Sequence, residues 1–161
     1  MRKILYLMAV LMLFASCARQ APKVERLHVE GTALVNEKGD TVELKGMSFG
    51  WNVLWPRFYN ASAVKHVVED WEAEIVRAAI GVEIDDDECQ VQNYLKNPDF
   101  GKQCACTIVD AAIENGVYVL VDWHAHGLHT EAAVEFFTYM ATKYQGVPNV
   151  IYEIWNEPSY K

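Results

Sequence analysis

Largely apolar runs alternate with segments of helical periodicity along most of this chain. The apolar runs span Glu74 to Gly81 and Val117 to Val121, and a third, rich in β-branched and aromatic residues, follows Asn149. Between them, apolar side chains recur every three or four residues, as they do from Ala63 to Trp71. Strands without polar alternation, separated by helices, indicate a parallel sheet that is covered on both faces.

The expected order is a β-hairpin, then strand, helix, strand, helix, strand, helix, strand. The hairpin is predicted between Leu27 and Phe49 with its turn at Asn36 to Asp40, and Thr41 to Gly50 is predicted to run inward as a strand. The expected helices are Ala63 to Trp71, Asp99 to Asn115 and Thr130 to about Tyr144. Ser62 is expected to cap the first helix and Asp99 the second, and Gly116 is expected to end the second in the left-handed conformation.

This order predicts the fold class. Four strands joined by three helices are half of an eight-stranded barrel, so we expect an α/β fold: a partial (β/α)8 TIM barrel of about the first four strands, preceded by an N-terminal β-hairpin. A doubly wound sheet is the structural alternative. Its Gly-rich phosphate turn is absent, because Gly46 to Gly50 does not have the required spacing.

The N-terminus has the pattern of a secretory signal. The basic start Met1-Arg2-Lys3 precedes an apolar run from Ile4 to Ala15, which is shorter than the ~20 residues needed to span a bilayer. The sequence Phe14-Ala15-Ser16-Cys17 resembles a bacterial lipobox. We therefore predict that the chain is exported.

Residues 1–16 are accordingly expected to be a signal peptide, residues 17–26 a tether, and residues 27–161 the N-terminal half of a barrel. A lipidated Cys17 would make the product an outer-membrane or cell-surface lipoprotein that meets the membrane only through its lipid anchor. An ordinary signal peptide, cleaved nearby, remains the alternative and would give a periplasmic or extracellular protein.

The chain carries a net charge of −8, and loss of Arg2 and Lys3 with the signal peptide would make it −10. Such an acidic product repels phosphate groups, which excludes nucleic acid as a partner. The mature chain would keep Cys89, Cys104 and Cys106. A disulfide from Cys89 to one of the other two and three free thiols are both compatible with their spacing, which gives no metal site.

Polar and aromatic side chains gather where the predicted strands end. They are, strand by strand, Trp51, Asn52 and Trp55; Arg77 and Glu83; Asp122, His124 and His126; Asn156 and Glu157. Because a barrel brings its strand ends together at one mouth, these residues are expected to form one site. Aromatic faces that stack on sugar rings, together with groups that bind hydroxyls, suit a carbohydrate.

Glycoside cleavage requires two carboxyl groups, one to protonate the leaving oxygen and one to attack the anomeric carbon or activate water. Glu157 is the candidate for the first role, since Pro158 ends the strand directly after it. Asn156 is placed to hold a sugar hydroxyl, and Arg77 to keep a nucleophilic carboxylate ionised. The alternative for Arg77 is a structural ion pair with Asp122 or Glu74. Asp122 and Glu83 are the other carboxylates near strand ends, and Asp122 is expected to point sideways into the structure.

Four motifs together resemble the N-terminal half of glycoside hydrolase family 5, of the bacterial endo-β-1,4-glucanase (cellulase) type. The resemblance extends over about residues 27 to 158, with the motifs in the family's order. The motifs are Leu44-Lys45-Gly46-Met47-Ser48, Val76-Arg77-Ala78-Ala79, Val119-Leu120-Val121-Asp122-Trp123-His124 and Ile151-Tyr152-Glu153-Ile154-Trp155-Asn156-Glu157-Pro158.

The resemblance implies endo-hydrolysis of a β-glucan with retention, by two glutamates on the fourth and seventh barrel strands and without a cofactor or metal. Glu157 resembles the general acid/base and proton donor, Asn156 the residue that binds the substrate 2-hydroxyl, Arg77 the arginine that supports the nucleophile, and His124 the active-site histidine. Trp55 resembles an aromatic sugar platform.

Three further residues, Trp51, Asn52 and His126, are expected to bind substrate. Relatives often carry a histidine near the position of Asn52. The family's motifs are shared by enzymes for cellulose, mixed-linkage glucan, xyloglucan and mannan, so the polymer stays open.

Two other readings remain. His124 and His126, with His129 nearby, form the kind of pair that binds zinc in metal-dependent hydrolases. The chain is also compatible with a surface glycan-binding lipoprotein that uses its aromatic cleft without turnover. The better prediction for Trp123 is a core position.

The family's nucleophile belongs to a later part of the fold than these 161 residues reach. We therefore expect the chain alone to be inactive: either a fragment, or a half-barrel that pairs with a complementing C-terminal half or with itself. An open half-barrel has unpaired strand edges and an uncovered inner face, which favour association.

Overall fold

A computed structural model describes residues 24–158. Its main sheet has four parallel strands, in the order β3 (Gly46–Trp51), β4 (Ile75–Gly81), β5 (Tyr118–His124) and β6 (Val150–Glu153). Each strand lies beside the next one in the sequence, as in a (β/α)8 barrel, whereas a doubly wound sheet reverses its strand order. The sheet therefore agrees with the predicted partial barrel.

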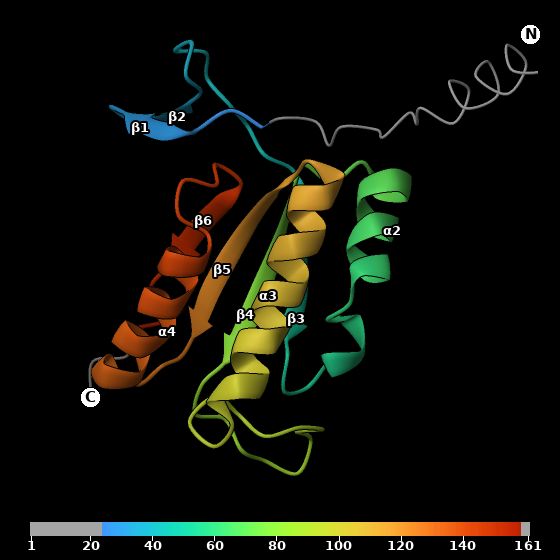
Figure 1. The fold of residues 1–161 in the computed structure, drawn as a ribbon, viewed down its shortest axis with the longest axis vertical. Coiled ribbons are helices and arrows are strands. Elements are labelled where there is room, and N and C mark those ends of the chain that lie inside the picture. Colours follow the sequence, from blue (N-terminus) through green and yellow to red (C-terminus); the bar gives the residue numbers. More distant parts are fainter. Residues whose placement is uncertain (1–23, 159–161) are drawn as a thin grey trace, which may run out of the picture.

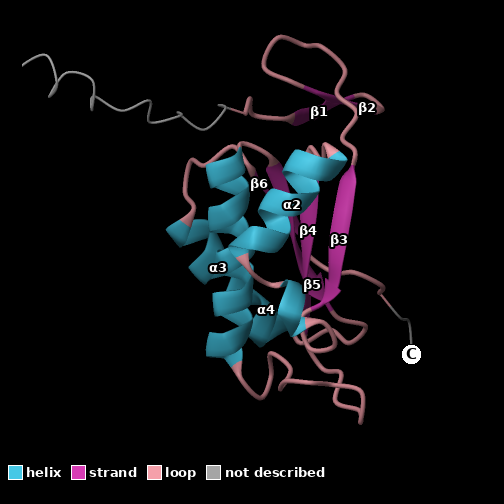
Figure 2. Cartoon of the chain, turned by 90° about the vertical axis from the view of Figure 1, so that its right-hand side faces the viewer, coloured by secondary structure: helices cyan, strands magenta, loops and turns pink. Residues whose placement is uncertain are grey.

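Three helices cover one face of this sheet. α2 (Ala61–Trp71) follows β3, α3 (Pro98–Asn115) follows β4 and α4 (Thr130–Lys143) follows β5, and all three lie on the same side (Figures 1 and 2). The one-turn 3-10 helix η1 (Pro56–Phe58) precedes α2. Within residues 24–158 the other face carries no helix, as expected for the inner face of a partial barrel.

The second face of β4 and β5 carries polar side chains among apolar ones at the positions that would fill a barrel interior. Successive strand residues point to opposite faces, so every second side chain joins the core under the helices. The core residues are Val76, Ala78, Ile80, Val119, Val121 and Trp123. The intervening positions include Arg77, Asp122 and His124, which therefore face the side opposite the helices.

An aromatic cluster fills the core beneath α4. Trp123 and Phe136 are 1% and 0% exposed, and their ring centroids lie 5.4 Å apart. Tyr94 packs edge-on against both, at 4.9 Å from Trp123 and 5.3 Å from Phe136. A Cβ at Gly101 of α3 would lie 2.6 Å from the Tyr94 ring, so this glycine makes room for the cluster. The core position predicted for Trp123 is confirmed.

Two helices begin with asparagine rather than at the predicted caps. Asn60 Oδ1 accepts a hydrogen bond from Ala63 N at 3.0 Å and caps α2, while the predicted cap, Ser62, donates its own hydroxyl to Asn60. Asn97 accepts from Phe100 N at 3.2 Å and caps α3, with Pro98 in the first turn. The predictions of Ser62 and Asp99 were wrong because each is preceded, two residues earlier, by an equally good capping side chain. Gly116 ends α3 in the left-handed conformation, with φ of 67°, as predicted.

Strand boundaries differ more than helix boundaries. β3 begins at Gly46 instead of Thr41. β5 continues through His124, three residues beyond the predicted end, and β6 stops at Glu153. Asp122 and His124 therefore stand on a strand, whereas Asn156 and Glu157 follow one.

The N-terminal hairpin is shorter than predicted. β1 (His28–Glu30) and β2 (Ala33–Val35) pair antiparallel around Gly31, whose φ is 60°. Residues 36–40 form a second turn, in which Asn36 Oδ1 accepts from the backbone N–H groups of Lys38 and Asp40. The hairpin lies at the end of the sheet where the strands begin (Figure 1), and the Tyr118 hydroxyl of β5 donates to Glu25 O at 2.6 Å.

Within residues 24–158 there is no helix long and apolar enough to cross a bilayer. The predicted signal peptide and Cys17 lie outside the described residues.

Phe136→Ala tests the core beneath α4. Removing this fully buried ring should lower the free energy of unfolding by about 3 to 5 kcal/mol, since it leaves a cavity against Trp123 and Tyr94. Val134→Ala on the same helix, at a position 61% exposed, should change it by less than about 0.5 kcal/mol. Urea titration measures both, and equal effects would contradict this packing.

Candidate active site

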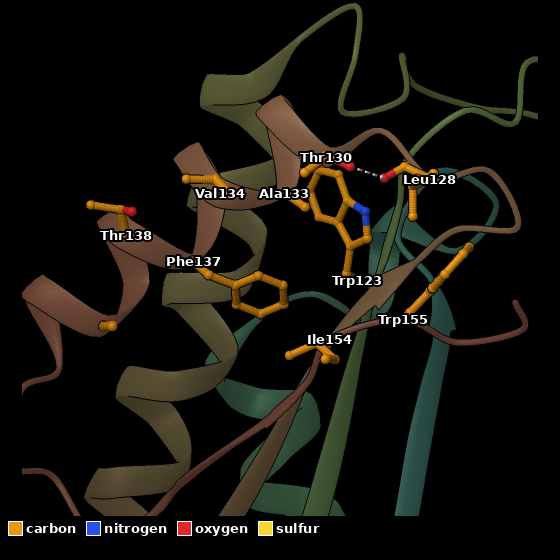
Figure 3. Close-up of a pocket in the computed structure, with 10 residues that line it drawn as sticks. Trp123, Leu128, Thr130, Ala133, Val134, Phe137, Thr138, Ile154 and Trp155 are labelled. Carbon is orange, nitrogen blue, oxygen red and sulfur yellow. Dashed lines mark hydrogen bonds between the residues drawn. The ribbon is translucent and has the colours of Figure 1, made fainter.

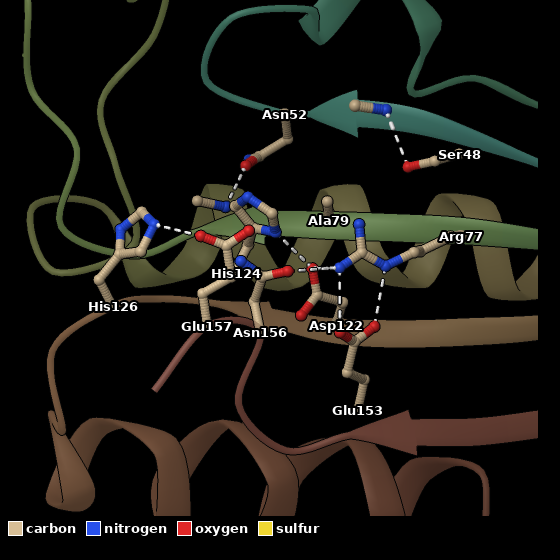
Figure 4. A network of polar contacts seen from close by, with 12 residues as sticks. Ser48, Asn52, Arg77, Ala79, Asp122, His124, His126, Glu153, Asn156 and Glu157 are labelled. Atoms are coloured by element: carbon tan, nitrogen blue, oxygen red, sulfur yellow. Dashed lines mark hydrogen bonds and ion pairs between the residues drawn. The ribbon is translucent and has the colours of Figure 1, made fainter. Parts of the chain in front are cut away.

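Arg77 connects three neighbouring strands at the centre of the polar face. Its Nε and Nη2 donate to the two carboxylate oxygens of Glu153 on β6 at 2.8 and 3.0 Å. Nη2 also lies 2.8 Å from Asp122 Oδ2 on β5 and donates to Asn156 Oδ1 at 2.9 Å. One guanidinium thereby orients the amide that precedes Glu157 (Figure 4).

Asp122 is fully buried and joins the arginine to a histidine. The same Oδ2 that contacts Arg77 lies 2.6 Å from His124 Nδ1, and the His124 ring is 8% exposed. A carboxylate at Nδ1 selects the tautomer that carries its proton there and leaves Nε2 as an acceptor. The predicted sideways orientation of Asp122 is confirmed, since it binds its strand neighbours.

Burial and charge oppose each other in this network. Burial raises the pKa of Asp122 above its ordinary 3.8, and the contacts with His124 and Arg77 only partly offset that rise. Burial lowers the pKa of Arg77, but its hydrogen bonds to Glu153 and the charge of Asp122 outweigh this effect, so the pKa lies above its usual value. Arg77 therefore stays charged.

Glu157 stands beyond β6 in an irregular segment that remains beside the end of β5. Asn156 N donates to Trp123 O at 3.3 Å, and Glu157 N lies 3.5 Å from Ala125 O. The Glu157 side chain is 71% exposed, and its Oε2 lies 3.3 Å from His126 Nε2. The predicted residues thus lie together in two adjoining groups of contacts: Arg77, His124 and Asn156 are joined through Arg77 and Asp122, and His126 contacts Glu157, the residue after Asn156 (Figure 4).

The aromatic residues predicted near the first strand separate into two places. The Trp51 ring packs edge-on against His124, with centroids 4.3 Å apart, and so belongs to this site. Trp55 is 41% exposed and lines a groove along β3 with Met47, Phe58 and Trp71. Gly50, at φ of 69°, permits this arrangement, because a Cβ there would lie 2.8 Å from the Trp55 ring.

Asn52 has a structural role that the sequence did not indicate. Its side chain is 1% exposed and its Oδ1 accepts from Gly81 N at 2.8 Å, which ties the end of β3 to the end of β4. The expected contact of Asn52 with substrate disagrees with this burial.

Two carboxylates make contacts that the sequence did not indicate, although Glu83 was expected near the strand ends. Glu153 had been read as part of the apolar strand, yet it makes the bidentate pair with Arg77. Glu83 Oε1 accepts from the backbone N–H groups of His126 and Gly127 at 2.7 and 3.0 Å. A charged residue in an otherwise apolar strand, such as Glu153, was the one available signal, since a buried charge requires a partner.

The histidines of the proposed zinc site contact carboxylates instead. His124 Nδ1 faces Asp122, His126 lies between Glu83 and Glu157, and His129 Nε2 is 3.4 Å from Glu83 Oε2. Among residues 24–158, no group of three His, Cys, Asp or Glu side chains is arranged to hold a metal ion. The cysteines in this part of the chain are free, and burial raises the pKa of Cys104 to about 11.

The family model for cellulase (glycosyl hydrolase family 5) matches residues 35–161, which is most of the chain. The chain belongs to glycoside hydrolase family 5. The resemblance noted from its motifs is therefore confirmed.

Relatives of known sequence within the family are endoglucanases. The chain is 40% identical over 141 residues to Endoglucanase Z of Dickeya dadantii, a match that covers 84% of this chain and 31% of that protein. It is 33% identical over 147 residues to an endoglucanase of Halalkalibacter akibai, of which it covers 18%. The chain thus spans about a third or less of the length of these relatives.

Solved structures agree in fold. A protein of Cytophaga hutchinsonii superposes with a TM-score of 0.77 at 44% identity, over 83% of this chain and 42% of that one. The catalytic domain of an endoglucanase from Thermobifida fusca superposes with a TM-score of 0.73 at 31% identity, over 83% and 43%. The four-stranded sheet is therefore part of a family 5 TIM barrel.

The Asp122 network predicts a pH dependence of stability. Because the pKa of Asp122 is raised above 3.8 on folding, the folded state binds this proton more tightly than the unfolded state. The contribution of Asp122 to stability is thus fully present at acid pH and is lost as the pH rises through the window above 3.8.

Asp122→Asn cannot titrate, so its stability relative to the unchanged chain should improve between about pH 3 and about pH 7. Urea titration at several pH values measures the difference. A deficit of Asp122→Asn that grows with pH would instead mean that the ion pair with Arg77 outweighs burial.

Proposed function

We propose that this chain supplies the proton-donor half of the active site of a retaining endo-β-1,4-glucanase. Glu157 is the general acid/base. The nucleophile is a second glutamate outside the described residues. The placement of Glu157 carries the proposal: an exposed carboxyl group beyond β6, next to an amide that Arg77 holds in place.

The surrounding side chains suit a sugar in this position. Asn156 Oδ1 is fixed by Arg77, which leaves the Asn156 amide N–H group to donate to a 2-hydroxyl. His124 is held by Asp122 and packed by Trp51, so that its Nε2 can accept from a hydroxyl. Arg77 provides the positive charge that favours an ionised nucleophile across the mouth.

The substrate class rests on the relatives. The matched proteins are endoglucanases, and a variant of the Thermobifida fusca catalytic domain has been solved in complex with cellotetraose. We propose a β-1,4-glucan or its oligosaccharides as the substrate, with the exposed ring of Trp55 as an outlying sugar platform.

Retention requires a second carboxyl group about 5 to 5.5 Å from Glu157. The contacts of residues 24–158 place His126, and not a carboxylate, beside it. We therefore propose that these 161 residues are catalytically incompetent by themselves and that a complementing half-barrel, in the same chain or in another, supplies the rest.

The sheet edges support association of this kind. Beyond β6, Ile154 is 73% exposed and joins Trp155, Phe137 and Leu128 in an apolar groove of about 540 Å³ against α4 (Figure 3). The Trp55 groove flanks the other edge strand, β3. Apolar surface on both sides of an incomplete sheet is surface that a completed barrel would bury.

Activity tests the role of Glu157. Purified 161-residue chain should hydrolyse carboxymethyl cellulose negligibly. Fused after residue 158 to the C-terminal half of the Dickeya dadantii barrel, it should gain turnover, and Glu157→Gln should lower the rate of that fusion about 10² to 10⁴-fold.

Glu131→Gln on the exposed first turn of α4 is the matched control and should leave the rate unchanged. Turnover by the monodisperse 161-residue chain that Glu157→Gln abolishes would show the incompetence proposal to be wrong. Full activity of the Glu157→Gln fusion would remove the acid/base role. Glucan binding without turnover in either form would favour the glycan-binding alternative.

We also propose, from the sequence alone, that the chain is exported and anchored through Cys17. Cys17→Ser should abolish incorporation of labelled palmitate and release the protein from the membrane fraction, because a serine cannot carry the thioether-linked lipid. Ala18→Ser, beside it, should keep both. Palmitate incorporation that persists in Cys17→Ser would contradict a lipid anchor at this position.

A further inference from the structure

Glu83 links two loops at the mouth and has no role in the chemistry described above. It follows β4 by two residues and is only partly exposed. Its Oε1 accepts hydrogen bonds from two successive backbone N–H groups, those of His126 at 2.7 Å and Gly127 at 3.0 Å. Such charge-assisted bonds to consecutive amides fix the path of the loop after β5.

The same carboxylate also faces the side chains of that loop. Oε1 lies 3.6 Å from His126 Nδ1, and Oε2, which is buried, lies 3.4 Å from His129 Nε2 without the geometry of a hydrogen bond. A Cβ at Gly127 would lie 2.8 Å from His129 Nε2, so the loop closes tightly around the carboxylate. Residues 126–129 are thus folded about Glu83.

The opposite side of the His126 ring reaches the candidate acid/base. His126 Nε2 lies 3.3 Å from Glu157 Oε2, while the Glu157 backbone lies beside Ala125 (Figure 4). Each ring nitrogen of His126 therefore faces a carboxylate oxygen, that of Glu83 at Nδ1 and that of Glu157 at Nε2.

We propose that Glu83 is a positioning residue for Glu157: it holds the loop after β5 so that His126 reaches the Glu157 carboxyl group. Three successive strand ends are thereby coupled in one chain of contacts, Glu83 to His126 to Glu157. The inference rests on the proposed role of Glu157 as proton donor. It adds the residues that position the Glu157 carboxyl group, which carries that proton.

Side-chain NMR of the 161-residue chain tests this without requiring turnover. With ¹⁵N-labelled histidine and ¹³C-labelled glutamate carboxyl groups, Glu83→Ala should shift the His126 ring nitrogen signals and the Glu157 carboxyl signal. Glu83→Gln keeps an acceptor for the two backbone N–H groups, so it should preserve their amide signals while still moving the His126 Nδ1 signal. Asp87→Asn, an exposed position on the same connection, should move none of these.

A double variant shows whether the effect passes through His126. Glu83→Ala should shift the Glu157 carboxyl signal in the unchanged background and no longer do so in a His126→Ala background. An equal shift in both backgrounds would overturn the proposal. So would a Glu83→Ala chain in which only the backbone amides move, since Glu83 would then merely support the loop.

If Glu83→Ala does not fold, the Glu83→Gln variant tests the proposal. A shift of the His126 ring nitrogen signals supports it, and unchanged ring nitrogen signals overturn it. This outcome is independent of the proposed function, which the rate of the Glu157→Gln fusion tests separately.

Discussion

The guanidinium of Arg77 lies between carboxylates from the two strands that follow its own, and these contacts fix where the strand ends stand. Asp122 is fully buried, so its charge depends on Arg77 and His124 for stabilisation, and removal of one partner from a buried pair typically costs about 3 to 5 kcal/mol. Glu153 extends the pair to β6. These contacts thereby link the polar side chains of β4, β5 and β6 to one another.

From this buried centre the structure becomes more open toward Glu157. Arg77 and Asp122 stand on strands, Asn156 is tied to Arg77, and Glu157 extends beyond them with 71% of its side chain exposed. A general acid works best where water is excluded, since electrostatic interactions strengthen in a closed site. The open position of Glu157 therefore fits a site that is completed from outside residues 24–158.

The sequence predicted the order of strands and helices, because apolar runs and helical spacing depend on burial alone. It also predicted that Arg77, His124, Asn156 and Glu157 meet, since parallel strands bring their ends together. The sequence suggested only one of the two carboxylates that pair with Arg77. Asp122 had been considered, but Glu153 lies within an apolar run, and its pairing depends on the register of β6 against β5.

Other predictions failed for local reasons. Asn52 was read as a mouth residue from its place near the first strand, but its amide completes the backbone hydrogen bonding of Gly81. The helix caps are Asn60 and Asn97 instead of the predicted Ser62 and Asp99. Several adjacent residues were able to cap each helix, and only the loop geometry decides which of them does so. Glu83 contacts a loop 43 residues away, which no local pattern reveals.

A crystal structure of the chain with a bound cello-oligosaccharide would test the central claim most directly. We predict a Glu157 carboxyl oxygen within about 2.6 to 3.2 Å of a glycosidic oxygen, and the Asn156 amide on the neighbouring 2-hydroxyl. An oligosaccharide bound only along the Trp55 groove, or one that contacts the strand ends but leaves Glu157 remote from every glycosidic oxygen, would contradict the account.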